Sequence, residues 1–203
     1  MKFKNNLNIW DKYASIWDTI LFQFFFNILY KISLKLIKEN LMGDKRILDI
    51  GCATGNFLYK IQKINKEAEL YGIDSSLRMI EIAKNKFKEI KFYNLKAEEA
   101  NFPENFFDII TIIEAFHHLQ NQTLALERIS RILKPNGILL IVEPDLNNKI
   151  TRFLLNLLKN FEIEKDANYL TQEELIKLTN NFQLKNEKVL KSLGSIFLVF
   201  RKI

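Results

Sequence analysis

The stretch Leu48-Asp-Ile-Gly-Cys-Ala-Thr-Gly-Asn-Phe57 decides the fold of this chain. The apolar run that leads into it predicts a short β-strand over 46–50, and apolar residues at helical spacing over 57–64 predict a helix after it. Gly51 and Gly55 let the connecting loop approach a bound ligand, because glycine has no Cβ. Since the first turn of a helix presents free N–H groups, the stretch predicts a ligand-binding turn between a strand and a helix.

The spacing of these glycines excludes the two common phosphate-binding loops. A dinucleotide fingerprint needs G-x-G-x-x-G, whereas this loop reads G-x-x-x-G with Ala53 at its centre. A P-loop ends in Gly-Lys-Ser or Gly-Lys-Thr, whereas Gly55 is followed by Asn56. Asp49 would also repel a pyrophosphate, and it suits a ligand that carries an ammonium group.

Composition indicates one well-packed domain. The chain has 203 residues, of which 48% are hydrophobic and only six are Gly and three Pro, so it has the material for a core and too few breakers for a disordered chain. The net charge of +6 suits an anionic partner, but the lysines are scattered singly, so we expect no strong nucleic-acid-binding patch. The single cysteine, Cys52, permits no internal disulfide, as in a reducing compartment.

The N-terminal region is predicted to be helical. Trp10, Tyr13 and Trp17 recur at helical spacing, and a long apolar helix is predicted over 19–41. Its most apolar run, Thr19–Tyr30, is far shorter than the roughly 20 residues that span a bilayer, so we expect a buried or surface-embedded helix. No signal-peptide pattern precedes it, and we expect a cytoplasmic protein, with or without peripheral membrane contact.

From residue 46 onward, short apolar runs alternate with helical patterns. Strands are predicted at 46–50, 69–73, 90–94, 107–113 and 138–142, with helices between them. Such alternation predicts an α/β fold with a doubly wound parallel sheet. Two helices, over 149–161 and 171–181, are then followed by two strands, 183–189 and 195–201, which predict a C-terminal β-hairpin.

Polar residues follow the predicted strands at their carboxyl ends, where ligands bind in open α/β sheets. Asp74 comes after the second strand, 23 residues beyond Gly51, where a carboxylate accepts hydrogen bonds from ribose hydroxyls. Glu98 and Glu114 follow the third and fourth strands. Taken together, these residues predict a nucleoside-binding site at this edge of the sheet.

Four segments resemble motifs I, post-I, II and III of the class I S-adenosylmethionine-dependent methyltransferases: 48–55, 71–76, 97–108 and 133–142. The segment 10–18 is similar to the Y-D-x-x-A-x-x-Y-D opening of the small-molecule and quinone-biosynthesis branches, with Trp in both Tyr places. The resemblance implies a Rossmann-like methyltransferase fold, with a seven-stranded, mostly parallel sheet. It also implies S-adenosyl-L-methionine as cofactor and S-adenosyl-L-homocysteine as product.

The resemblance implies roles for the matching residues. Four residues of the glycine loop would surround the methionine part of the cofactor through their backbone: Gly51, Cys52, Ala53 and Gly55. Four others would lie against the adenine: Ser75, Met79, Ala97 and Glu98. Asp49 would orient the ammonium group, Asp74 would bind the ribose hydroxyls, and Glu114 begins the segment beside the transferable methyl group.

Two residues depart from the family pattern. Ala53 replaces the commoner middle glycine, and we expect a negative φ there, which alanine tolerates. Lys96 stands where many relatives carry an Asp that reads the adenine amino group. We therefore expect backbone contacts to dominate adenine recognition.

The only two histidines, His117 and His118, resemble the His-His pair of several family members, in which one acts as a general base. Methyl transfer to oxygen or to an activated carbon needs a proton removed, and histidine titrates near working pH. Glu143 and Asp145 are candidates to orient such a base. The alternative is a structural role, and we predict no metal site, because adjacent residues rarely face one ion.

Apolar segments predict where the methyl acceptor binds. We expect 1–43 to form a helical lid, in which Tyr13 and Trp17 either close over the ligands or pack between helices. The core is expected over 44–203, with 146–181 as a helical insertion on the substrate side.

The apolar character of both helical regions favours a small hydrophobic acceptor, such as a quinone precursor, a lipid or another metabolite. The alternatives are an RNA or protein methyltransferase and a catalytically silent protein that binds the cofactor. We expect a monomer or a homodimer.

Overall fold

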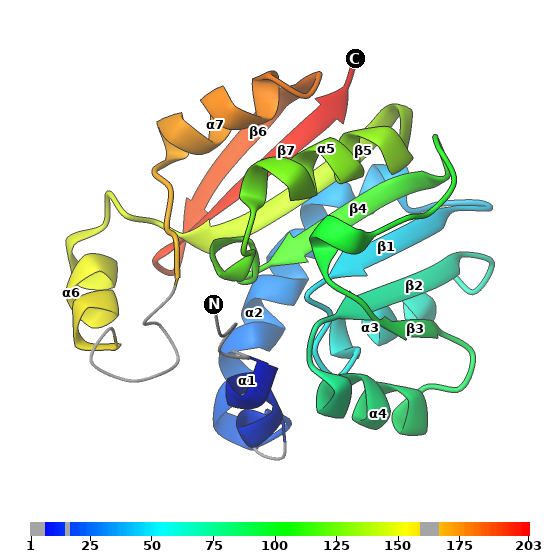
Figure 1. Cartoon of the computed structure of the whole chain (residues 1–203), viewed down its shortest axis with the longest axis horizontal. Helices are drawn as coiled ribbons and strands as arrows, with labels where there is room; N and C mark the ends of the chain where they lie inside the picture. The colour runs from blue at the N-terminus through cyan, green and yellow to red at the C-terminus, as the bar shows by residue number, and fades with distance from the viewer. Residues whose placement is uncertain (1–6, 15–16, 159–166) are drawn as a thin grey trace, which may run out of the picture.

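The computed structural model describes residues 7–14, 17–158 and 167–203, and its centre is one seven-stranded sheet (Figure 1). Its strands, in the order in which they neighbour one another, are β3 (Lys91–Asn94), β2 (Glu69–Asp74), β1 (Arg46–Ile50), β4 (Phe107–Ile113), β5 (Leu133–Pro144), β7 (Ser195–Lys202) and β6 (Leu184–Ser192). Strands β1 to β5 are parallel, and β7 runs antiparallel to both β5 and β6. The predicted mostly parallel sheet with a closing hairpin is confirmed.

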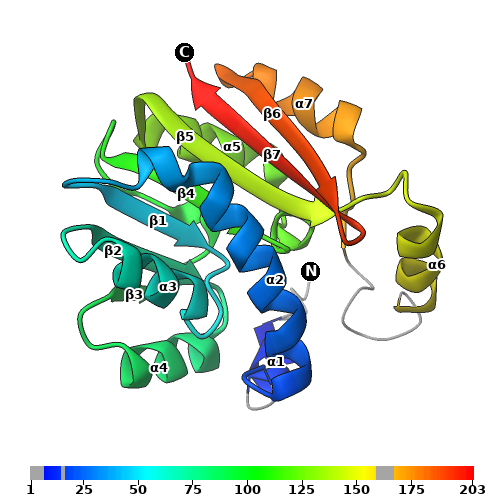
Figure 2. The ribbon, with the colours of Figure 1, turned by 180° about the vertical axis from the view of Figure 1, so that it is seen from behind.

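Helices cover both faces of this sheet, which Figures 1 and 2 show from opposite sides. One face carries α2 (Ile20–Ile37), α3 (Asn56–Ile64) and α4 (Leu77–Lys86), whose buried residues share a core with the strands. The other carries α5 (Gln122–Ile132) and α7 (Gln172–Asn180), over a second core. Both faces are covered because the central strands are apolar on both sides, as expected of parallel strands. Three 3-10 turns connect elements: Lys38–Asn40, Ala97–Glu99 and Phe116–His118.

Two helices lie beyond the carboxyl ends of the parallel strands. Helix α1 (Leu7–Tyr13) comes before α2, and α6 (Lys149–Leu158) follows β5 and stands away from the sheet in both views (Figures 1 and 2). The predicted extension of this helix to residue 161 lies outside the described residues. Among the described helices, none is long and apolar enough to cross a membrane.

The strand order reverses at β1, which pairs with β2 on one side and with β4 on the other. At its carboxyl end, Ile50 is the partner of Ile73 in β2 and of Ile112 in β4. The loops that leave these three strands therefore start side by side. A reversal of this kind opens a crevice in which doubly wound sheets bind their ligands.

Residues 135–137, Pro-Asn-Gly, lie inside β5, which begins at Leu133, and Asn136 adopts a positive φ of 62° there. The pairing of β5 with β4 is irregular at this point, since it shifts between Phe107 and Ile109. Helix α7 begins with a reciprocal capping box that Thr171 and Glu174 form.

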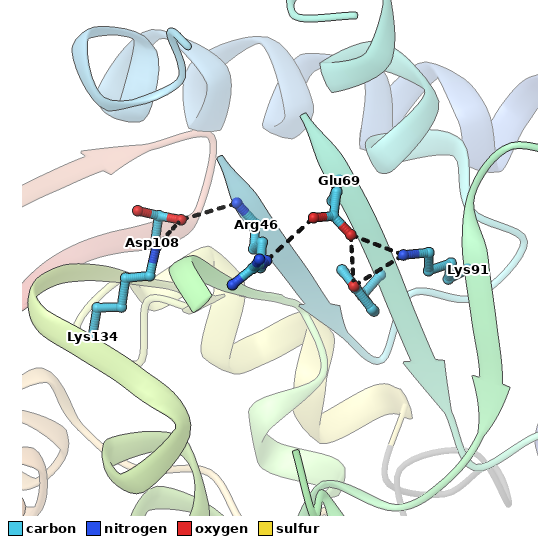
Figure 3. Close-up of polar contacts among 6 residues, drawn as sticks. Arg46, Glu69, Lys91, Asp108 and Lys134 are labelled. Atoms are coloured by element: carbon cyan, nitrogen blue, oxygen red, sulfur yellow. Dashed lines mark hydrogen bonds and ion pairs between the residues drawn. The ribbon is translucent and has the colours of Figure 1, made fainter. Parts of the chain in front are cut away.

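Charged residues form a network at the amino ends of the strands, at the edge of the sheet opposite to the loops that leave β1, β2 and β4 (Figure 3). Arg46, the first residue of β1, donates through Nε to Glu69 Oε1 at 3.2 Å. Glu69 also pairs with Lys91 Nζ at 2.8 Å, and hydrogen bonds from Lys91, Tyr71 and Arg46 lower the pKa of Glu69 to about 2. Asp108 accepts from the Arg46 backbone N–H. The network joins adjacent strands at the edge that faces away from the candidate site.

Candidate functional site

A cavity of about 240 Å³ lies at the carboxyl ends of β1, β2 and β4. The predicted site residues that line it are Trp17, Gly51, Ala53, Asp74, Ser75, Met79, Ala97, Glu98, Glu114 and His118. Trp10, the first residue of the segment 10–18, also lines it, as do residues that no motif singled out, among them Ile113, Ala115 and Asn168. The predicted site residues from five separate segments of the sequence thus meet at one place.

Five predicted site residues are not among those that line this cavity. Asp49 and Cys52 are buried behind the loop, and Gly55 precedes α3 with a positive φ of 81°. Tyr13 ends α1, and His117 is buried below the wall that His118 forms. For these residues the roles implied by the sequence stay predictions.

Asp74 holds the glycine loop against the start of α4. Its Oδ2 accepts a hydrogen bond from the Ala53 backbone N–H, and its Oδ1 accepts one from the Ser76 backbone N–H, both at 2.9 Å. Burial raises the pKa of Asp74, the two backbone hydrogen bonds oppose that shift, and nearby Asp11 adds to it. Each carboxylate oxygen has room for a second hydrogen bond. Asp74 can therefore position the loop and accept from ligand hydroxyls at once.

Ala53 has a φ of +46°, so the expectation of a negative φ at this position was wrong. The reason lies in the turn, because the Ala53 N–H must point at Asp74 Oδ2 between two glycines that also have positive φ. A residue with a Cβ in this region costs roughly 1–2 kcal/mol relative to its relaxed backbone. Local strain in the loop is thus balanced by a hydrogen bond to the half-buried carboxylate of Asp74.

Gly51 is required by a close approach between two loops. A Cβ at this position would lie 2.5 Å from Cβ of Ala115, which follows β4. Gly51 also has a φ of +70°, and both residues line the cavity. A larger residue would therefore push the loop or Ala115 into the space where a ligand binds.

Asp49 is buried in β1, one residue before the cavity wall. Thr111 Oγ1 donates a hydrogen bond to its Oδ1 at 2.7 Å. Burial raises the pKa of Asp49 to about 7, the Thr111 hydrogen bond opposes this shift, and Asp74 adds to it. The carboxyl group is therefore poised to change its charge near neutral pH when a cation approaches.

The two histidines occupy different environments. The His117 ring is buried, with Nδ1 2.7 Å from Glu143 Oε2, and it stacks on Tyr169 with ring centroids 4.5 Å apart. His118 lines the cavity, where burial and the neighbouring His117 lower its pKa to about 2. At neutral pH His118 is thus an uncharged imidazole. The geometry favours His118 for ligand contact, and it makes Glu143 the orienting partner of His117.

Asp145, the other residue predicted to orient a histidine base, bonds to different partners. It accepts from the Asn147 N–H and lies 3.5 Å from Lys191 Nζ.

Two residues that the sequence did not single out, Asn168 and Gln122, hold the segment that carries His117 and His118. The Asn168 backbone N–H donates to His117 O at 2.8 Å, and its side chain donates to Gln122 Oε1 at 3.0 Å. Gln122 Nε2 in turn donates to Asn168 O at 2.8 Å. Asn168 is 50 residues from His118, so no local pattern in the sequence relates them.

Lys96, the second departure from the family pattern, also lines the cavity. Its Nζ lies 3.2 Å from Gln120 Oε1, which it reaches as a donor. A cation therefore stands where a carboxylate would read an amino group.

Comparison with known proteins agrees with this geometry. A model of a methyltransferase domain family matches residues 41–193. The chain belongs to this methyltransferase family. Its fold is that of the class I enzymes: a SAM-dependent methyltransferase from Thermotoga maritima, described as a possible histamine N-methyltransferase, superposes with a TM-score of 0.78 at 18% identity, over 97% of this chain and 99% of that one.

Curated relatives of this methyltransferase differ in what they act on. Carboxy-S-adenosyl-L-methionine synthase of Helicobacter pylori is 36% identical over 53% of this chain and 46% of the relative. The tRNA N(3)-methylcytidine methyltransferase trm140 of Schizosaccharomyces pombe is 32% identical over 78% of this chain and 56% of the relative. The chain thus spans about half the length of these relatives.

The family implies S-adenosyl-L-methionine as methyl donor, and the cavity of this methyltransferase fits such a group. Gly51 packs against Ala115 in the wall, so the backbone of the glycine loop borders the cavity, and Asp74 offers acceptors for hydroxyls. Asp74 and Glu114 place carboxylates on the walls, which favours a cationic sulfonium. Trp10 and Trp17 add aromatic rings, and such rings attract cations.

Proposed function

We propose that this methyltransferase binds S-adenosyl-L-methionine in the cavity and transfers its methyl group to a small hydrophobic acceptor. The observation that supports binding of the donor is that the half-buried carboxylate of Asp74 holds the glycine loop and also lines the cavity. When bound, the donor supplies a methyl group on a sulfonium. What this chain adds is orientation and exclusion of water.

Residues of the chain that lie near the transfer point are suited to this role. Glu114 lines the cavity in a strained conformation, with a φ of +52°, and its Oε1 accepts from Ser195 Oγ at 2.8 Å. Strain of this kind is concentrated at functional sites. His118 is neutral, so we propose that it positions an acceptor through hydrogen bonding or packing. This refines the general-base role that the sequence suggested for the pair.

Apolar side chains beside the cavity support a hydrophobic acceptor. Helix α6 exposes Ile150, Phe153, Leu154 and Leu157, with 71%, 64%, 51% and 47% of their surface accessible. Near the start of α2, Phe24 is also 69% exposed. Figures 1 and 2 show α6 and the start of α2 beyond the carboxyl ends of the strands, on the side of the cavity. Exposed apolar side chains on this side of the molecule suit an apolar acceptor or the phase that carries it.

The charges on the same helices support contact with an anionic membrane surface. Helices α2 and α6 contain four basic residues, Lys31, Lys35, Lys149 and Arg152, and no acidic one. Apolar side chains combined with basic ones are typical of helices that lie in the plane of a membrane surface. We propose that a lipid-like acceptor reaches the cavity from that surface.

Isothermal titration with S-adenosyl-L-methionine and S-adenosyl-L-homocysteine tests the donor half. We expect both to bind at micromolar concentration, and failure of both would overturn the proposal at its root. A radiolabelled-methyl survey of cell extract, separated into lipid, RNA and protein fractions, tests the acceptor half. Label in the lipid fraction supports the proposal, whereas label confined to RNA or protein would replace the acceptor class.

A further inference from the structure

The N-terminal segment crosses the candidate donor site as a strap, which we define as residues 7–14 and 17–19. Trp10 and Trp17 of the strap line the cavity, with ring centroids 5.9 Å apart. Between them, Ala14 is 1% exposed and packs in one apolar cluster with Ala53 and Met79. The strap thus forms one wall of the cavity and lies on its glycine loop.

One aspartate fastens the strap to the start of α4. Asp11 Oδ1 accepts hydrogen bonds from Ser76 Oγ and, at 3.2 Å, from the Arg78 backbone N–H. Both donors are neutral: one is the hydroxyl of the N-cap residue Ser76, and the other is a backbone N–H of the first helical turn, which has no partner within the helix. Any oxygen acceptor of the right length satisfies this contact.

A second aspartate fastens the other end to the glycine loop and α3. Asp18 Oδ1 accepts from Thr54 Oγ1 and Asn56 Nδ2, each at 2.8 Å. Its Oδ2 lies 2.9 Å from Lys86 Nζ, in an ion pair whose two side chains are about a third exposed. Burial alone would raise the pKa of Asp18, but the hydrogen bonds from Lys86, Asn56 and Thr54 lower it. A negative charge is therefore part of this contact.

The two ends differ in how firmly they are held. Ser76 donates to both Asp11 and Asp74, through its hydroxyl and its backbone N–H, so two carboxylates meet at this end, and Asp11 raises the pKa of the half-buried Asp74. The Asp18 end is continuous with α2: Gln23 Nε2 donates to Trp17 O at 3.1 Å, and the Trp17 ring packs on Phe26. Phe26 belongs to the core of the protein.

We propose that Asp11 and Asp18 are positioning residues that hold the strap over the donor site, and that the strap opens at Asp11 while Asp18 acts as its hinge. The proposal rests on the proposed function, in which this cavity binds the methyl donor. It makes strap opening the step that admits and releases the nucleoside.

Intrinsic fluorescence can follow the strap, because Trp10 and Trp17 are the only tryptophans of the chain. Stopped-flow release of S-adenosyl-L-homocysteine gives the dissociation rate. We expect Asp11→Ala to raise this rate about tenfold, the effect of losing the two hydrogen bonds that Asp11 Oδ1 accepts. We expect Asp11→Asn to stay within about twofold of wild type, since a neutral oxygen accepts the same bonds.

The hinge end should respond differently to the same chemistry. Asp18→Asn and Lys86→Met should each raise the dissociation rate about two- to fivefold, because a partly exposed ion pair contributes little more. Lys84→Met, on the exposed side of the same helix, is the matched control and should leave the rate unchanged. A wild-type dissociation rate in Asp18→Asn protein, or in Asp11→Ala protein, would overturn the proposal.

Acrylamide quenching of the ligand-free protein separates this proposal from the proposed function. In Trp17→Phe protein, where Trp10 alone reports, Asp11→Ala should at least double the quenching constant. In Trp10→Phe protein, where Trp17 reports, it should change little. Equal increases at both tryptophans would overturn the hinge. If the wild-type protein binds no donor and these quenching differences still appear, the proposed donor site is wrong, whereas the proposed opening of the strap at Asp11 is supported.

Discussion

At the scale of single residues, Asp74 has a structural role in the candidate site that the sequence motif does not indicate. It bonds the glycine loop at Ala53 and the α4 cap at Ser76, and it still lines the cavity. Because the loop adopts its strained turn around this carboxylate, removal of Asp74 affects both the shape of the site and its chemistry.

Replacing Asp74 with Ala should weaken donor binding about tenfold or more, because a charged hydrogen-bond acceptor contributes roughly 1.5–3 kcal/mol. Titration calorimetry with S-adenosyl-L-homocysteine measures the change. Glu81→Ala, an exposed carboxylate on α4, is the control and should bind like wild type. Equal affinities for Asp74→Ala and wild type would remove this residue from the donor site.

Ala53 offers a test of backbone strain. Ala53→Gly should leave the free energy of unfolding unchanged or raise it by up to about 1 kcal/mol, because relief of the positive φ offsets the extra freedom of the unfolded chain. Ala83→Gly in the middle of α4 should instead lower it by about 1 kcal/mol. Urea unfolding of both variants gives the comparison, and equal losses would argue against strain in the loop.

Asp49 makes a prediction about pH. Its pKa in the folded protein is raised to about 7 from an ordinary value near 3.8, so the unfolded chain loses this proton first. The contribution of protonated Asp49 to the free energy of unfolding is fully present below the pKa of the unfolded chain. It is lost as pH rises towards 7, at up to about 1.4 kcal/mol per pH unit. Thermal melts between pH 5 and pH 7.5 should show wild type losing stability relative to Asp49→Asn. Parallel curves would mean that Asp49 titrates normally.

At the scale of elements, α6 is the part of the fold whose sequence and position fit least well with a simple core. Its apolar side chains point to solvent, while its basic residues are well placed for anionic headgroups. We expect wild type to co-sediment with vesicles that contain phosphatidylglycerol and much less with pure phosphatidylcholine vesicles.

Phe153→Ser should weaken this vesicle binding about tenfold, since burial of such a side chain contributes roughly 1.5–3 kcal/mol. Leu190→Ser, an exposed leucine on β6, is the matched control. Binding that is insensitive to Phe153 would place the contact on another surface.

At the scale of the whole molecule, the chain is one sheet with a charged network at the amino ends of the strands (Figure 3) and a cavity at the carboxyl ends. A ligand that binds only the folded state stabilises the entire domain. S-adenosyl-L-homocysteine at about 100 times its dissociation constant should therefore add roughly 2.7 kcal/mol, which raises the melting temperature by several degrees. No shift at saturating concentration would contradict the donor site.

Local patterns in the sequence were enough for the sheet, its helices and the closing hairpin. Together with the resemblance to a known family, they also predicted many of the residues that line the cavity, because topology alone brings strand ends together at a switch point. Only the tertiary structure decided which side chains reach the cavity. Burial turned one histidine into a neutral wall residue and placed the other on Glu143, and it set the charge of Asp49. The tertiary structure also brings Asp11 to Ser76 and Asn168 to Gln122, although these residues are far apart in the sequence. Such contacts depend on distances in space that no spacing along the chain encodes.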